Sequence, residues 1–428
     1  MTSGQKISDG RKVAIIGNMN NSGFALLRYF RDLGADAYLL PYATDGHGNL
    51  SHFSPEADTW YPARWRSFIR PLDVPNSSRA LLGATGTLWS RRTRAKLNAD
   101  LVEYGHFVGS GMAPALFQTL GRQLDIYFPY GTGIEFYGDI EFNRHMHSSA
   151  LRRCSHSLVR HLQGRGIQST RRCLNAEMSL TKSSFDHIGK PFERLAIPAV
   201  YNAESHPESV PEGLTSVVAK LRASDLSMFC CARLLWVRDP RFGERAWQSF
   251  TKNSDWMFLG LSQFVRQHPG SRPLLAVVEY GPDVEASKQL VRDLRLQDHV
   301  LWLPMMPRRE IMLLLEAADV GIGEFYRDPG VIWGGTGWEI LAAGRPLVQS
   351  FNFTVEGFTT EFGHAPPPIL DVSSADDLTR RLEALYADPM GRRRIGQQSL
   401  VWFNQFNGMG LARRWLDRLV PDGTQGER

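Results

Sequence analysis

The sequence has few cysteines and no long apolar run. Only four cysteines occur among 428 residues, and they form no CxxC pair and no cluster with histidine. This spacing gives no disulfide framework and no zinc site, so a reducing compartment is expected. No stretch is apolar enough to cross a bilayer, and MTSGQKISDGRK lacks the apolar core of a signal peptide. We expect a cytoplasmic protein, at most held peripherally at the inner membrane face.

Several ligand-binding motifs are also missing. No helix-turn-helix, RNP or zinc-finger pattern occurs, so nucleic acid is not an expected partner. The first glycine-containing turn, in KVAIIGNMNNSG, lacks the GxGxxG spacing, which argues against a Rossmann dehydrogenase. Short-period repeats are absent as well. What is left is ordinary globular composition, and a length that predicts two or three domains.

The charge is uneven along the chain. Residues 1–200 carry +8, from 24 Lys and Arg against 16 Asp and Glu, and the rest carries −3, from 25 against 28. Arginines and aromatic residues are interleaved in 60–72 and 88–97, and arginines also cluster in 151–166 and 169–174. Such segments suit anionic lipid headgroups, so an anionic membrane surface is one candidate partner. A solvated, arginine-rich surface is the alternative.

The first half of the chain opens with a β-α-β pattern. KVAIIG (12–17) predicts a strand, FALLRYFRDLG predicts a helix with a glycine stop, and ADAYLLPY (35–42) predicts a second strand. This opening indicates the α/β class with a parallel, doubly wound sheet. Further strands are predicted at 104–111, 124–133, 176–182 and 194–201.

The second half repeats the alternation after a segment rich in Pro, Ser, Glu and Gly (202–213), which predicts an interdomain linker. Strands are predicted at 227–235, 273–281, 299–306, 320–325 and 345–352, and helices at 252–270, 282–298, 307–319 and 333–344. The expected domains are 1–205, 206–405 and a C-terminal segment, 406–428. An amphipathic helix in that last segment (408–420) is expected to cross back to the first domain.

A glycine-rich segment, WGGTGWE, opens one of these predicted helices. Gly334, Gly335, Thr336 and Gly337 let a ligand approach the backbone, and free N–H groups at a helix N-terminus favour phosphate. Glu339 is then expected on the first turn, as an acceptor for a sugar hydroxyl. The same glycines would also suit a tight turn without a ligand, so both interpretations stay open.

Two cationic residues lie where open α/β sheets place ligand-binding groups. Arg233 follows a predicted strand, and Lys252 begins a predicted helix. A guanidinium fork and a mobile ammonium would together neutralise a diphosphate. Ordinary surface charge is the alternative for either residue alone.

Taken in order, these segments resemble a known family. ARLL…KNSDWMFLGLSQF is similar to the Gly-Arg-Leu…Lys-Gly pattern of retaining GT-B glycosyltransferases of family 4 (glycosyl transferases group 1). GTGWEILAAGRPLV resembles the glycine-rich Glu-Ala-x-Ala-x-Gly-x-Pro segment of that family. The resemblance is strong over residues 227–352 and weak in the first half. It implies two Rossmann-like domains facing a cleft, with the nucleotide sugar in the C-terminal domain and the acceptor in the N-terminal one.

The resemblance also implies roles for individual residues. Arg233 and Lys252 would hold the donor diphosphate as catalytic groups, and Glu339 would bind the nucleotide ribose. The backbone of Gly334–Gly337 would lie near the phosphates and the sugar, and Met305 would flank the base. No DxD pattern occurs, so no metal is expected at the diphosphate.

One position departs from the family pattern. The motif has two glutamates, and the first falls at Val331. The nearest acid upstream is Glu324, at the end of the preceding predicted strand, and an insertion at YRDPGV would let it take that role. Glu324 is therefore the candidate for the missing catalytic glutamate.

The first half supplies fewer candidates. Gly17 and Asn18 follow the first strand and would touch the donor phosphate or the acceptor. His106 precedes a glycine turn, where both a catalytic and a purely structural role are open. The FPYGTG segment is similar to a Pro-Tyr-Gly motif of a bacterial subset of the family. The candidates for binding the acceptor are Tyr130 and Gly131 in this segment and Glu135 just after it.

The expected function is transfer of a hexose from a UDP-, GDP- or dTDP-sugar to a glycan or lipid-linked acceptor, with retention and without another cofactor. Bacterial cell-surface polysaccharide or glycoconjugate synthesis is the expected setting. Two alternatives stay open. One is another nucleotide-sugar enzyme on the same scaffold, such as an epimerase, and the other is a non-catalytic GT-B-like binding or scaffold protein.

Overall fold

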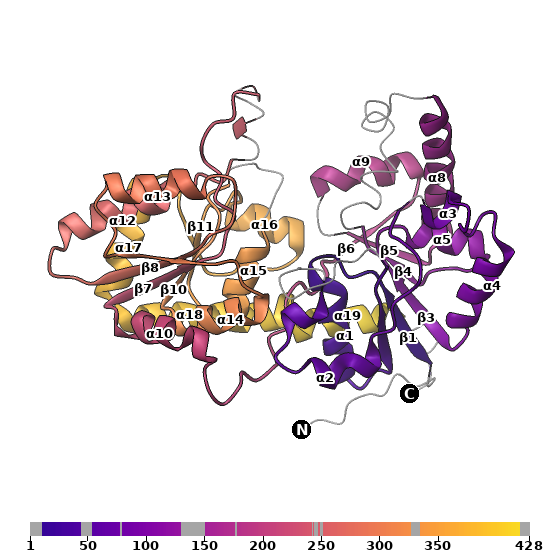
Figure 1. Ribbon diagram of the computed structural model, residues 1–428, viewed down its shortest axis with the longest axis horizontal. Coiled ribbons are helices and arrows are strands. Elements are labelled where there is room, and N and C mark those ends of the chain that lie inside the picture. The colour runs from indigo at the N-terminus through magenta and orange to yellow at the C-terminus, as the bar shows by residue number, and fades with distance from the viewer. Residues whose placement is uncertain are drawn as a thin grey trace. The chain divides into compact units, whose positions relative to one another are not determined.

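The chain divides into two compact units in the computed structural model (Figure 1). The first unit is Met1–Tyr201 with Asn407–Arg428, and the second is Asn202–Phe406. The structure describes residues 11–43, 54–77, 79–129, 150–175, 178–241, 243, 247–248, 251–326 and 334–419. Among these residues, no helix combines the length and the apolar character needed to cross a bilayer.

The first unit is built on a six-stranded parallel sheet in the order β2-β1-β3-β4-β5-β6. The chain passes from β1 through helix α1 (Ser22–Asp32) to β2, which lies beside β1, and β3 pairs with the other edge of β1. Four of the five residues of β1 are buried, as expected for a strand covered on both faces. The strands are β1 (Lys12–Ile16), β2 (Ala37–Leu40), β3 (Tyr104–Gly109), β4 (Ile126–Tyr127), β5 (Arg172–Asn175) and β6 (Glu193–Arg194).

Two predicted strands of this unit are wrong. The segment 176–182 falls largely in a helix, α9 (Met178–Ile188), and the strand lies just upstream as β5. Phe185 is fully buried and Ile188 packs beside it at helical spacing, a pattern that the alternation over 176–182 does not reveal. The segment 194–201 is paired in the sheet only at its first residue, Arg194, which ends β6, and Pro198 further along has no backbone donor for a ladder.

The remaining helices of the first unit cover its sheet. They are α2 (Pro62–Trp65), α3 (Arg79–Leu82), α4 (Arg91–Asp100), α5 (Ala113–Leu120), α8 (Ala150–Ser169) and α19 (Met409–Leu419), with 3-10 turns at Met19–Asn21, Pro55–Asp58 and Arg66–Phe68. Helix α8 packs closely along α5. The Gln163 side chain of α8 joins them, because it accepts from the N–H of Ala115 at 3.0 Å and donates to the carbonyl of Gly111 at 2.9 Å.

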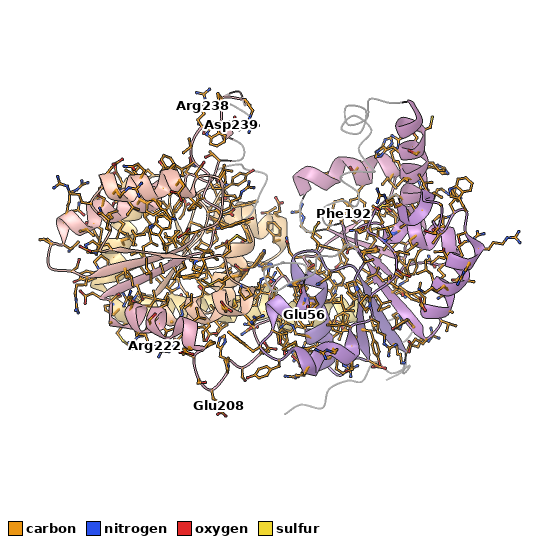
Figure 2. All side chains as sticks on the ribbon, in the orientation of Figure 1. Glu56, Phe192, Glu208, Arg222, Arg238 and Asp239 are labelled. Atoms are coloured by element: carbon orange, nitrogen blue, oxygen red, sulfur yellow. The ribbon has the colours of Figure 1, made fainter. Side chains whose placement is uncertain are left out.

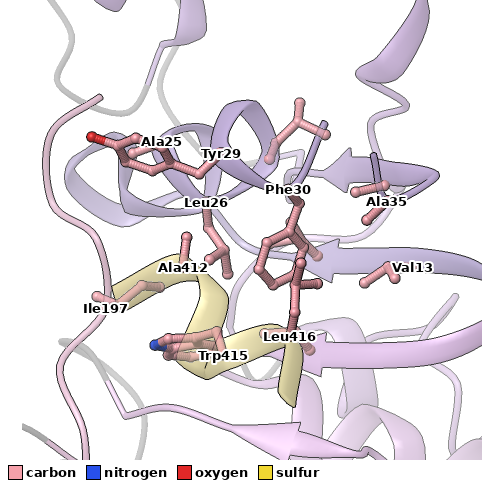
Figure 3. Close-up of a cluster of buried hydrophobic side chains, with 14 of the residues drawn as sticks. Val13, Ala25, Leu26, Tyr29, Phe30, Ala35, Ile197, Ala412, Trp415 and Leu416 are labelled. Atoms are coloured by element: carbon pink, nitrogen blue, oxygen red, sulfur yellow. The ribbon is translucent and has the colours of Figure 1, made fainter. Parts of the chain in front are cut away.

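Helix α19 is part of the first unit although it is last in the chain. It packs against α1, with Trp415 and Leu416 close to Leu26 and Phe30 (Figure 3). Trp415 is fully buried, and its indole N–H donates to the carbonyl of Ala196 at 2.6 Å. The chain therefore leaves the first unit at residue 201 and returns to it at residue 407.

The second unit has its own six-stranded parallel sheet, in the order β12-β11-β10-β7-β8-β9. The strands are β7 (Leu226–Cys230), β8 (Pro273–Val278), β9 (Val300–Leu303), β10 (Val320–Ile322), β11 (Leu347–Gln349) and β12 (Ile369–Asp371). The helices are α10 (Glu212–Ala223), α12 (Asp255–Gln267), α13 (Val284–Asp293), α14 (Arg308–Ala317), α15 (Gly335–Ala342), α16 (Val355–Phe362), α17 (Ala375–Ala387) and α18 (Pro389–Phe406). The expected class, two Rossmann-like α/β units with parallel sheets, is confirmed.

The helices of the second unit cover both faces of its sheet. In Figure 1, α12 and α13 lie on one face, and α10, α14 and α18 lie on the other. The side chains in Figure 2 fill the space between these layers, and Arg238 and Asp239 lie on a loop that extends beyond the helices. Between residues 353 and 407, where no element is predicted from the sequence, the structure has α16, β12, α17 and α18.

Candidate functional site

The strand order of the second unit creates one point where the winding of the chain reverses. β7 lies between β8 and β10. Helix α12 leads to β8 and helix α14 leads to β10, and these helices lie on opposite faces of the sheet (Figure 1). Met228 pairs with Val320 and Phe229 with Gly321, so the carboxyl ends of β7 and β10 lie level. In open parallel sheets, ligands bind outside the carboxyl ends at such a switch point. The residues just after β7 and β10 are therefore the first candidates.

A lysine and a glutamate form an ion pair at this point. Lys252 Nζ lies 2.5 Å from Glu324 Oε2, and the two side chains are only 20% and 13% exposed. The backbone fixes Lys252 there, since its N–H donates to the carbonyl of Leu235 and its carbonyl accepts from the N–H of Phe325. The prediction that Lys252 begins a helix is wrong. Lys252 lies three residues before α12, in a bend where Asn253 takes a left-handed φ of 44°.

Gly334 lies against the same carboxylate. It is the N-cap of α15, and a Cβ at this position would be 2.7 Å from Glu324 Oε2. At the next residue, Gly335, a Cβ would meet nothing within 4 Å. The carboxylate of Glu324 thus occupies the space in front of the N-terminus of α15, where the helix dipole attracts negative charge.

Glu339 lies on the second turn of α15, not on its first turn as predicted, and it is 7% exposed. The Nε of Arg308 donates to Glu339 Oε1 at 2.8 Å. On the other side, Cys231 Sγ lies 3.4 Å from Glu339 Oε2 and 3.9 Å from the hydroxyl oxygen of Thr336. Burial, and then the nearby Glu339 carboxylate, raise the pKa of the Cys231 thiol well above its usual value, so the thiol keeps its proton and donates.

Arg233 and Met305 are exposed at the same edge of the sheet. Arg233 follows β7, and no acidic side chain pairs with it among the described residues. The Ser254 hydroxyl donates to the Arg233 carbonyl at 3.4 Å, which links this residue to the bend that holds Lys252. Met305 is 48% exposed after β9, and Tyr280 after β8 is 37% exposed. The edge thus combines one unpaired cation with two exposed apolar side chains.

In the first unit, the loop after β1 is closed by internal contacts. Gly17 has φ 90°, and a Cβ there would lie 2.4 Å from the hydroxyl oxygen of Ser110. The Asn18 side chain is 1% exposed, and its Oδ1 accepts from the N–H of Phe24 at 2.9 Å. It also donates to Asn21 Oδ1 at 2.7 Å. The Asn18 amide therefore supports the start of α1.

The sequence suggested that His106 lies near the carboxyl end of its strand, and the structure places it earlier. It is the third residue of β3 and pairs with Val13, three residues before the strand ends at Gly109, or about 10 Å away at the usual rise per residue. It is 3% exposed, with Nδ1 3.7 Å from Asp125 Oδ2. His106 is therefore buried in the interior of the strand and does not belong to the loop that follows it.

The other predictions lie outside the described residues. They are the three acceptor candidates, Tyr130, Gly131 and Glu135, and the departing position Val331. In contrast, two residues of the switch point were missed by sequence reasoning. Arg308 belongs to an ordinary amphipathic helix pattern, and Cys231 reads as a small core residue. Their partner, Glu339, is distant along the chain, and no local pattern indicates such a contact.

No protein-family model matches the chain, and no curated protein matches its sequence. Solved structures do match its fold. HepE from Anabaena in complex with UDP is 12% identical, covers 95% of this chain and 98% of its own, and has a TM-score of 0.55. HepE has also been solved with UDP-glucose. WaaG, a glycosyltransferase involved in lipopolysaccharide biosynthesis, is 14% identical over 95% of this chain and 99% of its own, with a TM-score of 0.51.

A third similar structure is a putative UDP-N-acetylglucosamine 2-epimerase from Listeria monocytogenes. It is 12% identical over 99% of this chain and 98% of its own, with a TM-score of 0.51. At this level of identity, similarity shows the fold. The chain therefore has the GT-B fold expected from its sequence.

Proposed function

We propose that this chain is a glycosyltransferase that moves a hexose from a nucleotide sugar to a glycan or lipid-linked acceptor, with retention of anomeric configuration. One observation carries the proposal. Arg233, which has no acidic partner among the residues that the structure describes, meets a Lys252–Glu324 ion pair and the glycine N-cap of α15 at the switch point of a Rossmann-like sheet. This combination suits a diphosphate that carries a sugar.

The proposed donor site uses five parts of the second unit. Arg233 and Lys252 bind the diphosphate and stabilise the charge that grows on it as the glycosidic bond breaks. The N-terminus of α15, at Gly335 and Thr336, adds partial positive charge. Glu339 accepts hydrogen bonds from the ribose, and Met305 packs against the base. Two cations at the diphosphate make a metal ion unnecessary.

The reaction exchanges one bond to the anomeric carbon for another. The acceptor hydroxyl oxygen bonds to that carbon, the bond from the carbon to the diphosphate oxygen breaks, and a donor phosphate oxygen takes the hydroxyl proton. Glu324 replaces the glutamate missing at position 331 and contacts the sugar hydroxyls. Its position beside Lys252 and Gly334 supports this role, because the sugar is bonded to the diphosphate that these groups would hold.

The acceptor is proposed to bind the N-terminal unit, with Tyr130, Gly131 and Glu135 as contacts. The setting we propose is synthesis of a bacterial cell-surface polysaccharide or glycoconjugate, at the cytoplasmic face of the inner membrane. Helix α4 supports the membrane contact. Arg91 and Arg92 are exposed on its acid-free first turn, and Trp89 just before it is 64% exposed. Basic residues beside an exposed indole suit anionic lipid headgroups.

The membrane contact has its own test. The protein should co-sediment at low salt with vesicles that contain anionic lipid and should remain free with zwitterionic ones. Replacing Trp89 and Arg92 with alanine should release it. Equal binding of the variant would remove α4 from the proposal.

The function is tested with a panel of UDP-, GDP- and dTDP-sugars. One nucleotide sugar should raise the Tm of the protein, and that one should release its nucleotide when an acceptor is added. An epimerase is the second candidate, since the Listeria protein shares the fold. It would change the sugar without needing an acceptor. A rise in Tm without any turnover would instead favour a binding or scaffold protein.

A further inference from the structure

The carboxylate of Glu339 is held from two sides by residues of two other segments. Arg308, the first residue of α14, donates from Nε to Oε1 at 2.8 Å, and Cys231, directly after β7, lies 3.4 Å from Oε2. The side chains of Arg308 and Glu339 are 12% and 10% exposed. The ion pair is therefore shielded from solvent, and its geometry is fixed by α14, α15 and β7 together.

Such an arrangement leaves the carboxylate able to accept further hydrogen bonds, because each of its oxygens has one contact only within the described part of the chain. An ionised carboxylate offers about four lone-pair sites, and the two contacts here use one on each oxygen. The remaining sites suit a pair of neighbouring hydroxyl groups, which a ribose presents.

We propose that Arg308 is a positioning residue for nucleotide recognition, which acts by holding the Glu339 carboxylate in the orientation that accepts the ribose hydroxyls. The inference rests on the proposed function, because it assumes that a nucleoside diphosphate binds at the switch point. Because Arg308 acts through Glu339, removing the Arg308 side chain should weaken the binding only of ligands that carry the ribose hydroxyls.

The neighbouring arginine provides a matched control. Arg309 is the next residue of α14, and its guanidinium lies 3.9 Å from the carboxylate of Glu310. Its side chain is 19% exposed, close to the 12% of Arg308. Replacing Arg309 with alanine therefore removes a similar side chain from the same turn without touching the ribose-binding carboxylate.

The experiment measures Kd by calorimetry for UDP and GDP, for the 2′,3′-dideoxy form of each, and for dTDP, which carries the 3′ hydroxyl alone. Wild-type protein should prefer the diphosphate with ribose hydroxyls. Arg308→Ala should lose about 10- to 100-fold in affinity for that ligand, as expected for hydrogen bonds to a charged group, and almost nothing for the dideoxy form. Arg309→Ala should bind both as wild type does, and Arg308→Lys, which keeps the charge, should recover part of the affinity.

A double-variant cycle completes the test. Because both residues serve the same hydroxyl contact, Arg308→Ala combined with Glu339→Gln should lose little more than either change alone. Equal losses for the hydroxylated and dideoxy ligands, or an unchanged affinity in a folded Arg308→Ala protein, would overturn the inference. If wild-type protein binds none of the diphosphates, the proposed function fails instead.

Discussion

Glu324 and Lys252 form an ion pair directly in front of the N-cap of α15, and Gly334 leaves the space that the Glu324 carboxylate fills. The Glu324 carboxylate thus lies where a diphosphate is proposed to bind. The ammonium of Lys252 has three donors, so it is able to hold Glu324 and a phosphate oxygen together. Single substitutions at these positions separate the contributions of the three residues.

Replacing Gly334 with alanine should disturb the ion pair. The new Cβ would be 2.7 Å from Glu324 Oε2, so the flexible carboxylate must move away from Lys252. We expect transfer to fall about 10- to 100-fold, the size of loss that a misplaced catalytic group produces, with little change in Tm. Gly213→Ala is the control, because this glycine lies in α10 and nothing is within 4 Å of its Cβ. Equal activities of the two variants would show that the packing at Gly334 is unimportant.

Glu324→Gln should affect nucleotide binding and transfer in opposite directions. It removes a negative charge beside Lys252, so UDP or the matching diphosphate should bind about 5-fold more tightly. Transfer should nevertheless fall at least about 10-fold, because the carboxylate is proposed to contact the sugar. Calorimetry gives the first quantity and nucleotide release the second. Tighter binding with unchanged transfer would remove Glu324 from the catalytic groups.

Trp415→Ala should destabilise the first unit. The side chain is fully buried, donates to the Ala196 carbonyl and lies near Phe128, at 5.8 Å between ring centroids. Loss of a buried tryptophan should lower the free energy of unfolding by about 3–5 kcal/mol, measured by urea denaturation. Arg413→Ala changes an exposed residue of the same helix and should have almost no effect. Equal free energies of unfolding for the two variants would mean that Trp415 does not anchor α19 to this unit.

Stability should fall in alkaline solution because of the buried thiols. Burial raises the pKa of Cys173 to about 12, from an ordinary value of 9.0. The unfolded chain therefore loses this proton first, and the free energy of unfolding should drop by about 1 kcal/mol between pH 9 and 10 from this group. In the Cys173→Ala variant, the free energy of unfolding should decline less steeply between pH 9 and 10. Cys154→Ala, at an exposed thiol, should keep the wild-type slope, and identical slopes for all three proteins would contradict the assignment.

The sequence predicts the second unit well because its information is local. Apolar strand patterns and helical spacing recur in short segments, and each predicted element from 227 to 352 overlaps a strand or helix of the structure. The first unit is harder. The short strands β4 and β6 have only two residues each, which is too few for a periodic pattern, and the apolar spacing at 176–182 was mistaken for a strand.

The geometry of the site is less accessible from sequence. Motifs indicate which residues follow which strands, and they therefore identify Arg233, Lys252 and Glu339 as candidates for the donor site. They do not show that Glu339 points to Arg308 or that Lys252 is paired with Glu324, since both contacts join segments far apart along the chain. His106 illustrates the reverse error, because a glycine nearby suggested a strand end that lies three residues further on.

The most direct test of the donor site is the activity of Arg233→Ala and Lys252→Ala, measured as nucleotide release with the nucleotide sugar that raises the Tm. We predict that each variant loses about 100- to 1,000-fold in transfer, as when a group that stabilises the leaving charge is removed, while the Tm of Arg233→Ala stays at the wild-type value. Arg272→Ala is the control, since this arginine is 77% exposed at the amino end of β8. Near-normal turnover in both the Arg233 and the Lys252 variants would contradict the account.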